Sequence, residues 1–433
     1  MSDRLSSRVL PGWTDPAALF EALESVSPDV FWLDAGTDAR EGWSFIGTGE
    51  RAGEPDAVRV DTDQGDAGAP PFRGGWVGWC DYESGAAAAG APSAPAIGRS
   101  WLRVRRVVAF DHESDRVWAL ADEADLDEWT AFVEEPRAVS AGAAVSGKGL
   151  LAKARHEPAE YMRLIERCRE LIRAGIAYQL CLTTRFTVPG RHDAVAAYLR
   201  LRAATPAHHG GFVRIGGRAL LSASPEQFLH AADGVIRTRP IKGTRPRSAD
   251  PGEDAALAAE LAVNVKERAE NVMIVDLMRN DLSRVCEPGS IRVDGLWQVE
   301  SYPAVHQLVS TVSGTASPGT TVGDLLEATF PAGSMTGAPK LSAMTRLHEL
   351  EGGQRGIYAG CFGYVGVDGS LDLAMVIRSI VVEQSEAVVG AGGGITWGSV
   401  PAAEVAEVAT KARAPLAALG AVLPEHWGSD ILN

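Results

Sequence analysis

The sequence predicts a large mixed α/β protein. Three observations predict this class: a length of 433 residues, a hydrophobic content of 45%, and an alternation between strand-like and helix-like segments. The strand-like segments are rich in β-branched and aromatic residues, whereas the helix-like segments repeat apolar residues at helical spacing. The length allows two or three average domains or one large fold, and the sequence contains no internal repeat.

The first part of the chain is expected to contain mainly β-structure. Residues 74–83, "GGWVGWCDYE", predict a short strand. Residues 101–111 and 116–121 are β-branched runs on either side of the turn signal "DHESD". This arrangement predicts a β-hairpin.

Three segments of biased composition separate these elements. Residues 59–75 and 84–99 are rich in small residues and proline, so both are expected to form irregular surface loops. Residues 134–149 have a similar composition and predict a boundary. We therefore expect an N-terminal part, residues 1–149, that packs on a catalytic part, residues 150–433.

The second part alternates between helices and strands. Its helical patterns cover residues 157–175, 254–280 and 402–419. The strands are expected at residues 178–188, 210–215, 218–224, 355–366, 371–383 and 387–397.

Charge and cysteine content exclude several classes of protein. The formal net charge of −15 argues against nonspecific nucleic-acid binding, and it means that an anionic substrate must be held by local cations or a metal. The chain has no apolar run long enough for a signal peptide or a membrane span. The five cysteines are widely spaced and form no metal-ligand pattern, so we expect reduced thiols in a cytoplasmic protein.

Two glycine-rich segments match nucleotide-binding loops only in part. Residues 388–397, "VVGAGGGITW", have Ile395 where a dinucleotide fingerprint needs its last glycine. Residues 333–340, "GSMTGAPK", lack the Gly-Lys-Ser/Thr of a P-loop. We expect neither nicotinamide binding nor nucleotide hydrolysis. Each segment fits either a tight turn or a backbone site for an anion.

Two helical segments carry glutamates three positions apart. Glu267 and Glu270 form one pair, and Glu404 and Glu407 form the other. This spacing places both carboxylates of a pair on one helix face. Two such faces in one pocket would suit a hard cation such as Mg²⁺. Spacing alone fits a solvated helix face more often than a metal site.

Eight segments in the second part occur in an order that resembles one enzyme family. They are "SPEQF", "TRPIKGTRPR", "KERAENVMIVDLMRNDLSRVCEPGSIRV", "HQLVSTVSGT", "FPAGSMTGAPK", "IYAGCFGYVG", "MVIRSIVV" and "GAGGGI". Together they resemble the chorismate-utilising enzymes, which include anthranilate synthase, aminodeoxychorismate synthase, and the isochorismate and salicylate synthases. The resemblance is dense over residues 155–415. It implies a large sandwich of two stacked antiparallel sheets flanked by helices, chorismate as substrate and Mg²⁺ as cofactor.

The resemblance also implies site residues. Arg378 matches a residue that holds the enolpyruvyl carboxylate of the substrate, which a guanidinium can grip with two parallel bonds. The implied metal ligands are Glu270 and Glu407, supported by Glu267 and Glu404. The other implied substrate-binding positions are Tyr358, the backbone donors Gly392 and Gly394, Lys411, His306, Ser334, Thr244 and Gln179.

Gln179 and Lys242 distinguish the branches of this family. The water-using branch resembles the segment around Gln179 but has a lysine there as general base, a task that a neutral amide cannot perform. Anthranilate synthases resemble the segment around Lys242 but carry a small residue there. The component I chains of aminodeoxychorismate synthases carry lysine. The resemblance therefore implies a transferase that makes 4-amino-4-deoxychorismate from chorismate and ammonia, for 4-aminobenzoate and folate synthesis.

In that branch the lysine attacks C2 of the ring and displaces the C4 hydroxyl before ammonia displaces the lysine. The amine must be neutral to attack, and Arg239 and Arg245 would lower its pKa if they point toward the site. Glu226 matches the acid that protonates the departing oxygen. The alternative for Lys242 and its arginines is a solvated basic turn.

The ammonia is expected from a separate partner. The nearest match to a glutaminase nucleophile turn, around Cys361, has Ala359 in place of its first glycine and lies inside a family motif. We therefore expect a glutamine amidotransferase subunit as partner. Two rival functions stay open, namely amination at C2, as in anthranilate synthase, and a silent chorismate-binding subunit.

Overall fold

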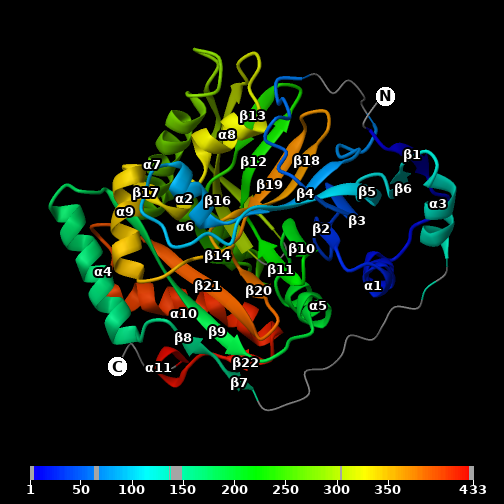
Figure 1. Ribbon diagram of the computed structural model, residues 1–433. Helices are drawn as coiled ribbons and strands as arrows, with labels where there is room; N and C mark the ends of the chain where they lie inside the picture. The colour runs from blue at the N-terminus through cyan, green and yellow to red at the C-terminus, as the bar shows by residue number, and fades with distance from the viewer. Residues whose placement is uncertain (1–3, 63–67, 136, 138–148, 303–304, 429–433) are drawn as a thin grey trace.

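The protein was analysed as a computed structural model that describes residues 4–62, 68–135, 137, 149–302 and 305–428 (Figure 1). The described strands are β1 (Ser6–Val9), β2 (Val30–Asp34), β3 (Trp43–Ala52), β4 (Gly75–Cys80), β5 (Ser100–Asp111), β6 (Arg116–Ala121), β7 (Leu150–Leu151), β8 (Lys153–Ala154), β9 (Gln179–Pro189), β10 (His209–Ile215), β11 (Arg218–Ser224), β12 (Gln227–Ala232), β13 (Val235–Thr238), β14 (Ile241–Pro246), β15 (Arg292–Ser301), β16 (Val305–Thr315), β17 (Gly337–Ala338), β18 (Cys361–Gly366), β19 (Leu371–Met375), β20 (Ser379–Val382), β21 (Glu386–Ile395) and β22 (Ala421–Val422). The described helices are α1 (Pro16–Val26), α2 (Tyr82–Ala88), α3 (Leu126–Glu134), α4 (Pro158–Arg173), α5 (Ala194–Ala204), α6 (Pro251–Val263), α7 (Val265–Leu282), α8 (Val322–Thr329), the short 3₁₀ helix η1 (Gly333–Met335), α9 (Lys340–Glu351), α10 (Pro401–Ala418) and α11 (Glu425–Gly428).

Three groups of buried apolar side chains show how the layers stack. One group, which includes Phe45, Trp79 and Phe362, comes from strands and loops without a helix, so it lies between facing strand layers. A second group joins strands to α1, α3, α4, α5, α9 and α10. The third joins strands to α2, α7 and α8. Both outer faces of the strand layers are therefore covered by helices, which confirms the predicted fold class.

The two layers are continuous with each other. The described strands form one network of 20, and β7 and β22 form a separate parallel pair. Strands of the N-terminal part also enter the catalytic part, because β2 pairs with β10 and β4 pairs with β18.

Both predicted hairpins are confirmed, since β5 pairs with β6 and β10 pairs with β11. The single helix expected over residues 254–280 is wrong. Asn264 has an extended backbone there, and its side chain caps α7 by accepting a hydrogen bond from the Glu267 amide, so the segment is divided into α6 and α7. The loop expected over residues 84–99 is wrong at its start, because Asp81 caps α2.

Parts of two other predictions lie outside the described residues, namely positions 63–67 of the expected loop and positions 136 and 138–148 of the expected boundary. All five cysteines are buried and free. None of the described helices combines the length and the apolar composition needed to cross a membrane.

Candidate active site

A cavity of about 540 Å³ lies where β14, β21, α7 and α10 meet. Its volume is in the range of small-molecule sites. It brings together most of the residues that the sequence singled out. Those on its wall are Glu226, Lys242, Thr244, Glu267, Glu270, Ser334, Tyr358, Arg378, Gly392, Gly394, Glu404, Glu407 and Lys411.

Lys242 reaches the cavity from an irregular point of β14. The pairing of β14 with β16 shifts register between Ile241 and Thr244. Gly243 lies between them with a φ of 82°, and a Cβ there would come within 3.0 Å of the Glu267 side chain. This position therefore requires glycine. The Lys242 amine makes no hydrogen bond or ion pair with the residues that the structure describes, so it is available to a ligand.

The arginines around Lys242 do not form a cationic cluster, which corrects the expectation for Arg239 and Arg245. Arg239 is paired with Glu300. Arg245 donates to Glu260 at 2.7 Å and lies 3.7 Å from Glu267. Each positive charge is therefore balanced by a carboxylate on a neighbouring element.

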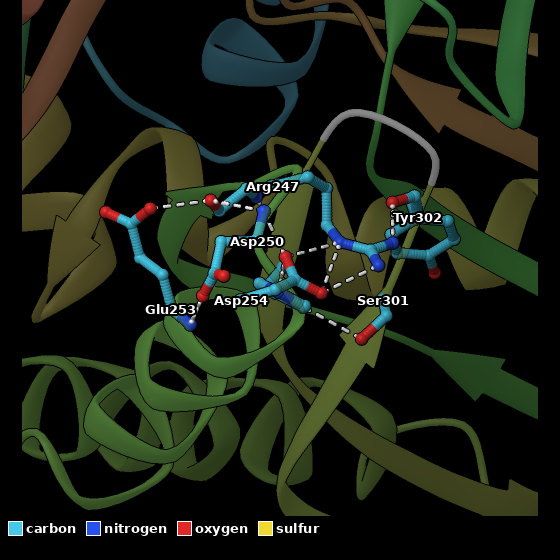
Figure 2. Close-up of polar contacts among 8 residues, drawn as sticks. Arg247, Asp250, Glu253, Asp254, Ser301 and Tyr302 are labelled. Atoms are coloured by element: carbon cyan, nitrogen blue, oxygen red, sulfur yellow. Dashed lines mark hydrogen bonds and ion pairs between the residues drawn. The ribbon is translucent and has the colours of Figure 1, made fainter.

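Arg247 is also paired, and Figure 2 shows it facing Asp254. The Arg247 guanidinium donates to the Asp254 carboxylate at 2.8 Å and to the Tyr302 carbonyl oxygen at 2.9 Å. Asp254 lies on α6, and Tyr302 follows β15. These contacts tie the end of the strand that carries Lys242 to two other elements.

Glu226 is the candidate proton donor on the wall of the same cavity as Lys242. Its side chain is almost completely buried. Burial raises the pKa of Glu226 to about 7, against a smaller opposing effect of Lys242, the Ser334 hydroxyl and Lys411. A carboxyl group with such a pKa is protonated in about half of the molecules at pH 7, so it can donate a proton there.

Arg378 and Tyr358 form the opposite side of the cavity. Arg378 has a φ of 52°, a left-handed conformation that costs energy for a residue with a side chain. No carboxylate among the described residues is ion-paired with its guanidinium, so the cavity offers an unpaired cation to an anionic ligand. The Tyr358 ring lies directly on Gly390, where a Cβ would come within 2.1 Å of it.

The glycine-rich end of β21 has one free edge. β20 pairs with β21 only as far as Val389, whereas β9 pairs with it along its whole length. Backbone groups beyond Val389 therefore lack a partner strand on one side, and Gly392 and Gly394 line the cavity there. Lys411 donates to the Gly392 carbonyl oxygen at 2.8 Å and lies 2.7 Å from Glu407.

The carboxylates of α7 and α10 converge on the same cavity. As placed, the described residues include no group of three acidic, histidine or cysteine side chains close enough to hold a metal. Burial raises the pKa of Glu270 and of Glu404, and a neighbouring carboxylate adds to each shift. One carboxylate oxygen of Glu270 is buried without a hydrogen-bond partner. This donor set is chemically suited to a hard cation.

Gln179 begins β9, the strand that pairs with β21, and it is not among the residues that line the cavity. It is completely buried, and both polar atoms of its amide lack a hydrogen-bond partner. A Cβ on Gly394 would lie 2.8 Å from the Gln179 amide nitrogen and 3.5 Å from the Lys242 amine. The two side chains therefore approach the same glycine.

His306 is not among the residues that line the cavity, so its expected role stays a prediction without support from this geometry. Its ring nitrogens are 2.8 Å from the Ser301 hydroxyl and 2.9 Å from the Asp254 carboxylate. Because side chains alternate along a strand, its neighbours Val305 and Gln307 line the cavity instead. Gln307 is one residue that sequence reasoning missed, and its buried amide oxygen has no hydrogen-bond partner. The alternation along this strand was the signal that could have identified it.

Comparisons with known proteins agree with this arrangement. A family model described as chorismate binding enzyme matches residues 13–417. An aminodeoxychorismate synthase of Streptomyces pristinaespiralis is 41% identical over 366 residues, which are 80% of this chain and 51% of the relative. Anthranilate synthase component 1 of Streptomyces coelicolor A3(2) is 41% identical over 379 residues, which are 81% of this chain and 74% of the relative.

A solved structure shows the same fold. The crystal structure of anthranilate synthase component I from Streptococcus pneumoniae TIGR4 matches with a TM-score of 0.75 and 29% identity, over 89% of this chain and 94% of that chain. The present chain spans about half the length of the two Streptomyces aminodeoxychorismate synthases that it matches. Relatives with two different names are equally identical, so overall identity does not distinguish them. The ordered motifs, the fold and the match over most of its length place this chain in the family of chorismate binding enzymes.

Proposed function

We propose that this chain aminates chorismate at C4 to give 4-amino-4-deoxychorismate, through a covalent bond to Lys242. The observation that carries the proposal is that one cavity contains both a candidate nucleophile and a candidate acid. The Lys242 amine is unpaired, and the Glu226 carboxyl group has a pKa of about 7. Displacement of a hydroxyl group needs such a nucleophile and such an acid. Bacterial and plant relatives named aminodeoxychorismate synthase support it.

The proposed reaction has two displacements. The Lys242 nitrogen forms a bond to C2, both ring double bonds shift by one position, and the bond between C4 and its oxygen breaks. Glu226 gives its proton to this oxygen, which leaves as water, and then accepts the proton released by the alkylated lysine. Ammonia forms a bond to C4 while Glu226 returns its proton to the lysine nitrogen, so that the C2–N bond breaks and Lys242 leaves as a neutral amine. The new ammonium group at C4 then gives its extra proton to Glu226. The sum is chorismate plus ammonia giving the amino product plus water.

Other cavity residues hold the substrate. Arg378 is the cation available for the enolpyruvyl carboxylate, and its rigid guanidinium suits a planar, bidentate contact. The free edge of β21 supplies backbone donors for the carboxylates of chorismate. Lys411 is held beside this edge by its contacts with the Gly392 carbonyl oxygen and Glu407.

We further propose Mg²⁺ as the cofactor. Glu270 and Glu407 would hold it, with Glu267 and Glu404 in support. The ion would neutralise the ring carboxylate of chorismate, which the net charge of the chain repels. Calorimetric titration with Mg²⁺ should show binding to the wild type and much weaker binding to Glu270→Gln. Equal binding by both proteins would contradict the ligand assignment.

Ammonia is proposed to come from a separate glutamine amidotransferase subunit. Relatives are named component 1 of their synthases, which supports a second component. The product would then serve 4-aminobenzoate and folate synthesis in the cytoplasm. Ammonium salts should replace the partner in vitro. Full activity of the purified chain with glutamine alone would contradict this part.

Product identification tests the proposal. The purified chain is incubated with chorismate, ammonium and Mg²⁺, and the products are separated by liquid chromatography and mass spectrometry. We expect 4-amino-4-deoxychorismate, and 4-aminobenzoate after addition of the lyase. Anthranilate would instead support C2 amination, which the equal identity to an anthranilate synthase keeps as the second candidate.

A substitution tests the covalent step. Lys242→Ala should retain the fold but lose C4 amination, because the nucleophile is absent. Intact-protein mass spectrometry of the wild type with chorismate and no ammonia should detect the lysine adduct. Wild-type rates in the alanine variant would exclude the covalent role.

A further inference from the structure

Asn271 is a polar residue that lies beside the catalytic cavity without lining it. It is on α7, directly after Glu270, and its side chain is completely buried. Its amide oxygen accepts a hydrogen bond from the Ser310 hydroxyl at 2.6 Å. Its amide nitrogen donates to the carbonyl oxygen of Pro240 at 3.5 Å. Both ends of the amide are therefore used inside the protein, and one of them contacts the segment that carries Lys242.

The neighbouring hydrogen bonds fix the orientation of the Asn271 amide. The Ser310 hydroxyl oxygen accepts from the backbone amide of Trp297 at 3.0 Å, and the hydroxyl proton goes to Asn271. Only the oxygen of a side-chain amide can accept that proton. The amide nitrogen therefore points toward Pro240, where the backbone amide of Ser310 also donates at 3.2 Å. The Pro240 carbonyl oxygen thus has two donors, one from α7 and one from β16.

These bonds hold the chain on one side of Lys242, and Gly243 holds it on the other. Pro240 stands two residues before Lys242 in the sequence. Gly243 follows the lysine directly, and it packs so closely on α7 that a Cβ would come within 3.0 Å of the Glu267 side chain. α7 therefore contacts this turn both before and after the lysine. The same helix presents Glu270 on the cavity wall, so the position of Lys242 is set relative to the carboxylates of α7.

We propose that Asn271 is a positioning residue that directs Lys242 toward the substrate. This inference rests on the proposed covalent role of Lys242. The lysine side chain is long and flexible, and its amine makes no hydrogen bond or ion pair with the residues that the structure describes. The place that the amine reaches therefore depends on the backbone that bears it, which the bonds to the Pro240 carbonyl oxygen orient. A displacement of about 1 Å at a reacting atom can cost about 10²-fold in rate. Because Asn271 does not line the cavity, its loss should lower kcat and leave the KM for chorismate nearly unchanged.

Paired substitutions separate positioning from stability. Asn271→Leu keeps the branched shape of the side chain but removes both hydrogen bonds, which leaves the buried Ser310 hydroxyl without its acceptor. Adding Ser310→Ala removes this hydroxyl and gives the new methyl group room, and loss of both partners costs less stability than loss of one. Asn280→Leu is the matched control, because Asn280 is exposed on the same helix. Each variant is characterised by thermal melting, by steady-state amination of chorismate with ammonium and Mg²⁺, and by mass spectrometry of the lysine adduct formed without ammonia.

We expect Asn271→Leu to lower kcat and the rate of adduct formation by about 10²-fold, with the KM for chorismate within about threefold of wild type. The double variant should melt at a higher temperature than the single variant and still react as slowly, whereas the Asn280→Leu control should match the wild type.

Three results would overturn the positioning role: a wild-type rate in Asn271→Leu, a loss confined to the KM for chorismate, or a rate that recovers together with stability in the double variant. If the single variant does not fold, the rate of the double variant decides. Absence of both the adduct and the C4-amino product in the wild type would instead overturn the proposed function, and the role of Asn271 with it.

Discussion

Removal of the charge on Glu226 should make the protein more stable and less active. Burial raises the pKa of this carboxyl group from 4.5 to about 7. The folded protein therefore keeps a proton at pH values where the unfolded chain has lost it. The contribution of this group to stability is fully present below pH 4.5 and is lost as the pH rises through about 7.

The magnitude follows from the size of the shift. The pKa rises by about 2.5 units, and each unit corresponds to about 1.4 kcal/mol. Ionisation of Glu226 should therefore lower the free energy of unfolding by about 3 kcal/mol above pH 7. Glu226→Gln is neutral at every pH, so it should be more stable than the wild type by up to this amount at pH 8. The two proteins should differ little near pH 5.

Urea unfolding at pH 5, 6, 7 and 8 measures this difference. Glu349→Gln is the control, because Glu349 is half exposed and paired with Arg346 on a helix surface. Activity should change in the opposite direction, with a loss of about 10²- to 10⁴-fold in kcat for Glu226→Gln. The wild-type rate should fall about tenfold per pH unit above pH 7 as the acid ionises. A stability difference that is the same at pH 5 and pH 8 would refute the reasoning.

Three further predictions follow from single features of the cavity and its support. Gln307→Leu should raise the KM for chorismate about tenfold, since the unpaired amide faces the cavity; an unchanged KM in steady-state kinetics would contradict this. Gly390→Ala should displace the Tyr358 ring, because the added methyl group would overlap it. Thermal melting should then show a lower melting temperature, and calorimetry a lower affinity for chorismate. An affinity equal to that of the wild type would contradict the contact between residue 390 and the Tyr358 ring. Arg355→Met should lower the free energy of unfolding by about 3–5 kcal/mol, because it leaves the buried Glu351 charge unpaired. The double variant that also carries Glu351→Met should recover most of this loss, as measured by urea unfolding. If the single and the double variant lose the same free energy of unfolding, the pairing of Arg355 with Glu351 is contradicted.

Local patterns predicted the elements that depend on neighbours in sequence. The helix ending at Gly175 and both hairpins have apolar spacing and turn residues that act within a few positions. The same reasoning failed over residues 254–280, where continuous helical spacing concealed the break at Asn264. It also failed for α2, whose alanine-rich sequence resembles a linker although Asp81 caps it. Periodicity detects an amphipathic face, but a cap depends on one backbone conformation.

By itself, the sequence determined the family, the sandwich fold and most of the residues that line the cavity, because ordered motifs and glycines constrain the backbone that presents them. The tertiary structure decided three other matters. It paired Arg239, Arg245 and Arg247 with carboxylates from distant segments. It turned Gln307 rather than His306 into the cavity, and it placed a second, smaller cavity with both polar and apolar walls next to Tyr358. Each of these depends on which strands and helices become neighbours and on the face that each strand presents, and both are properties of the packed chain.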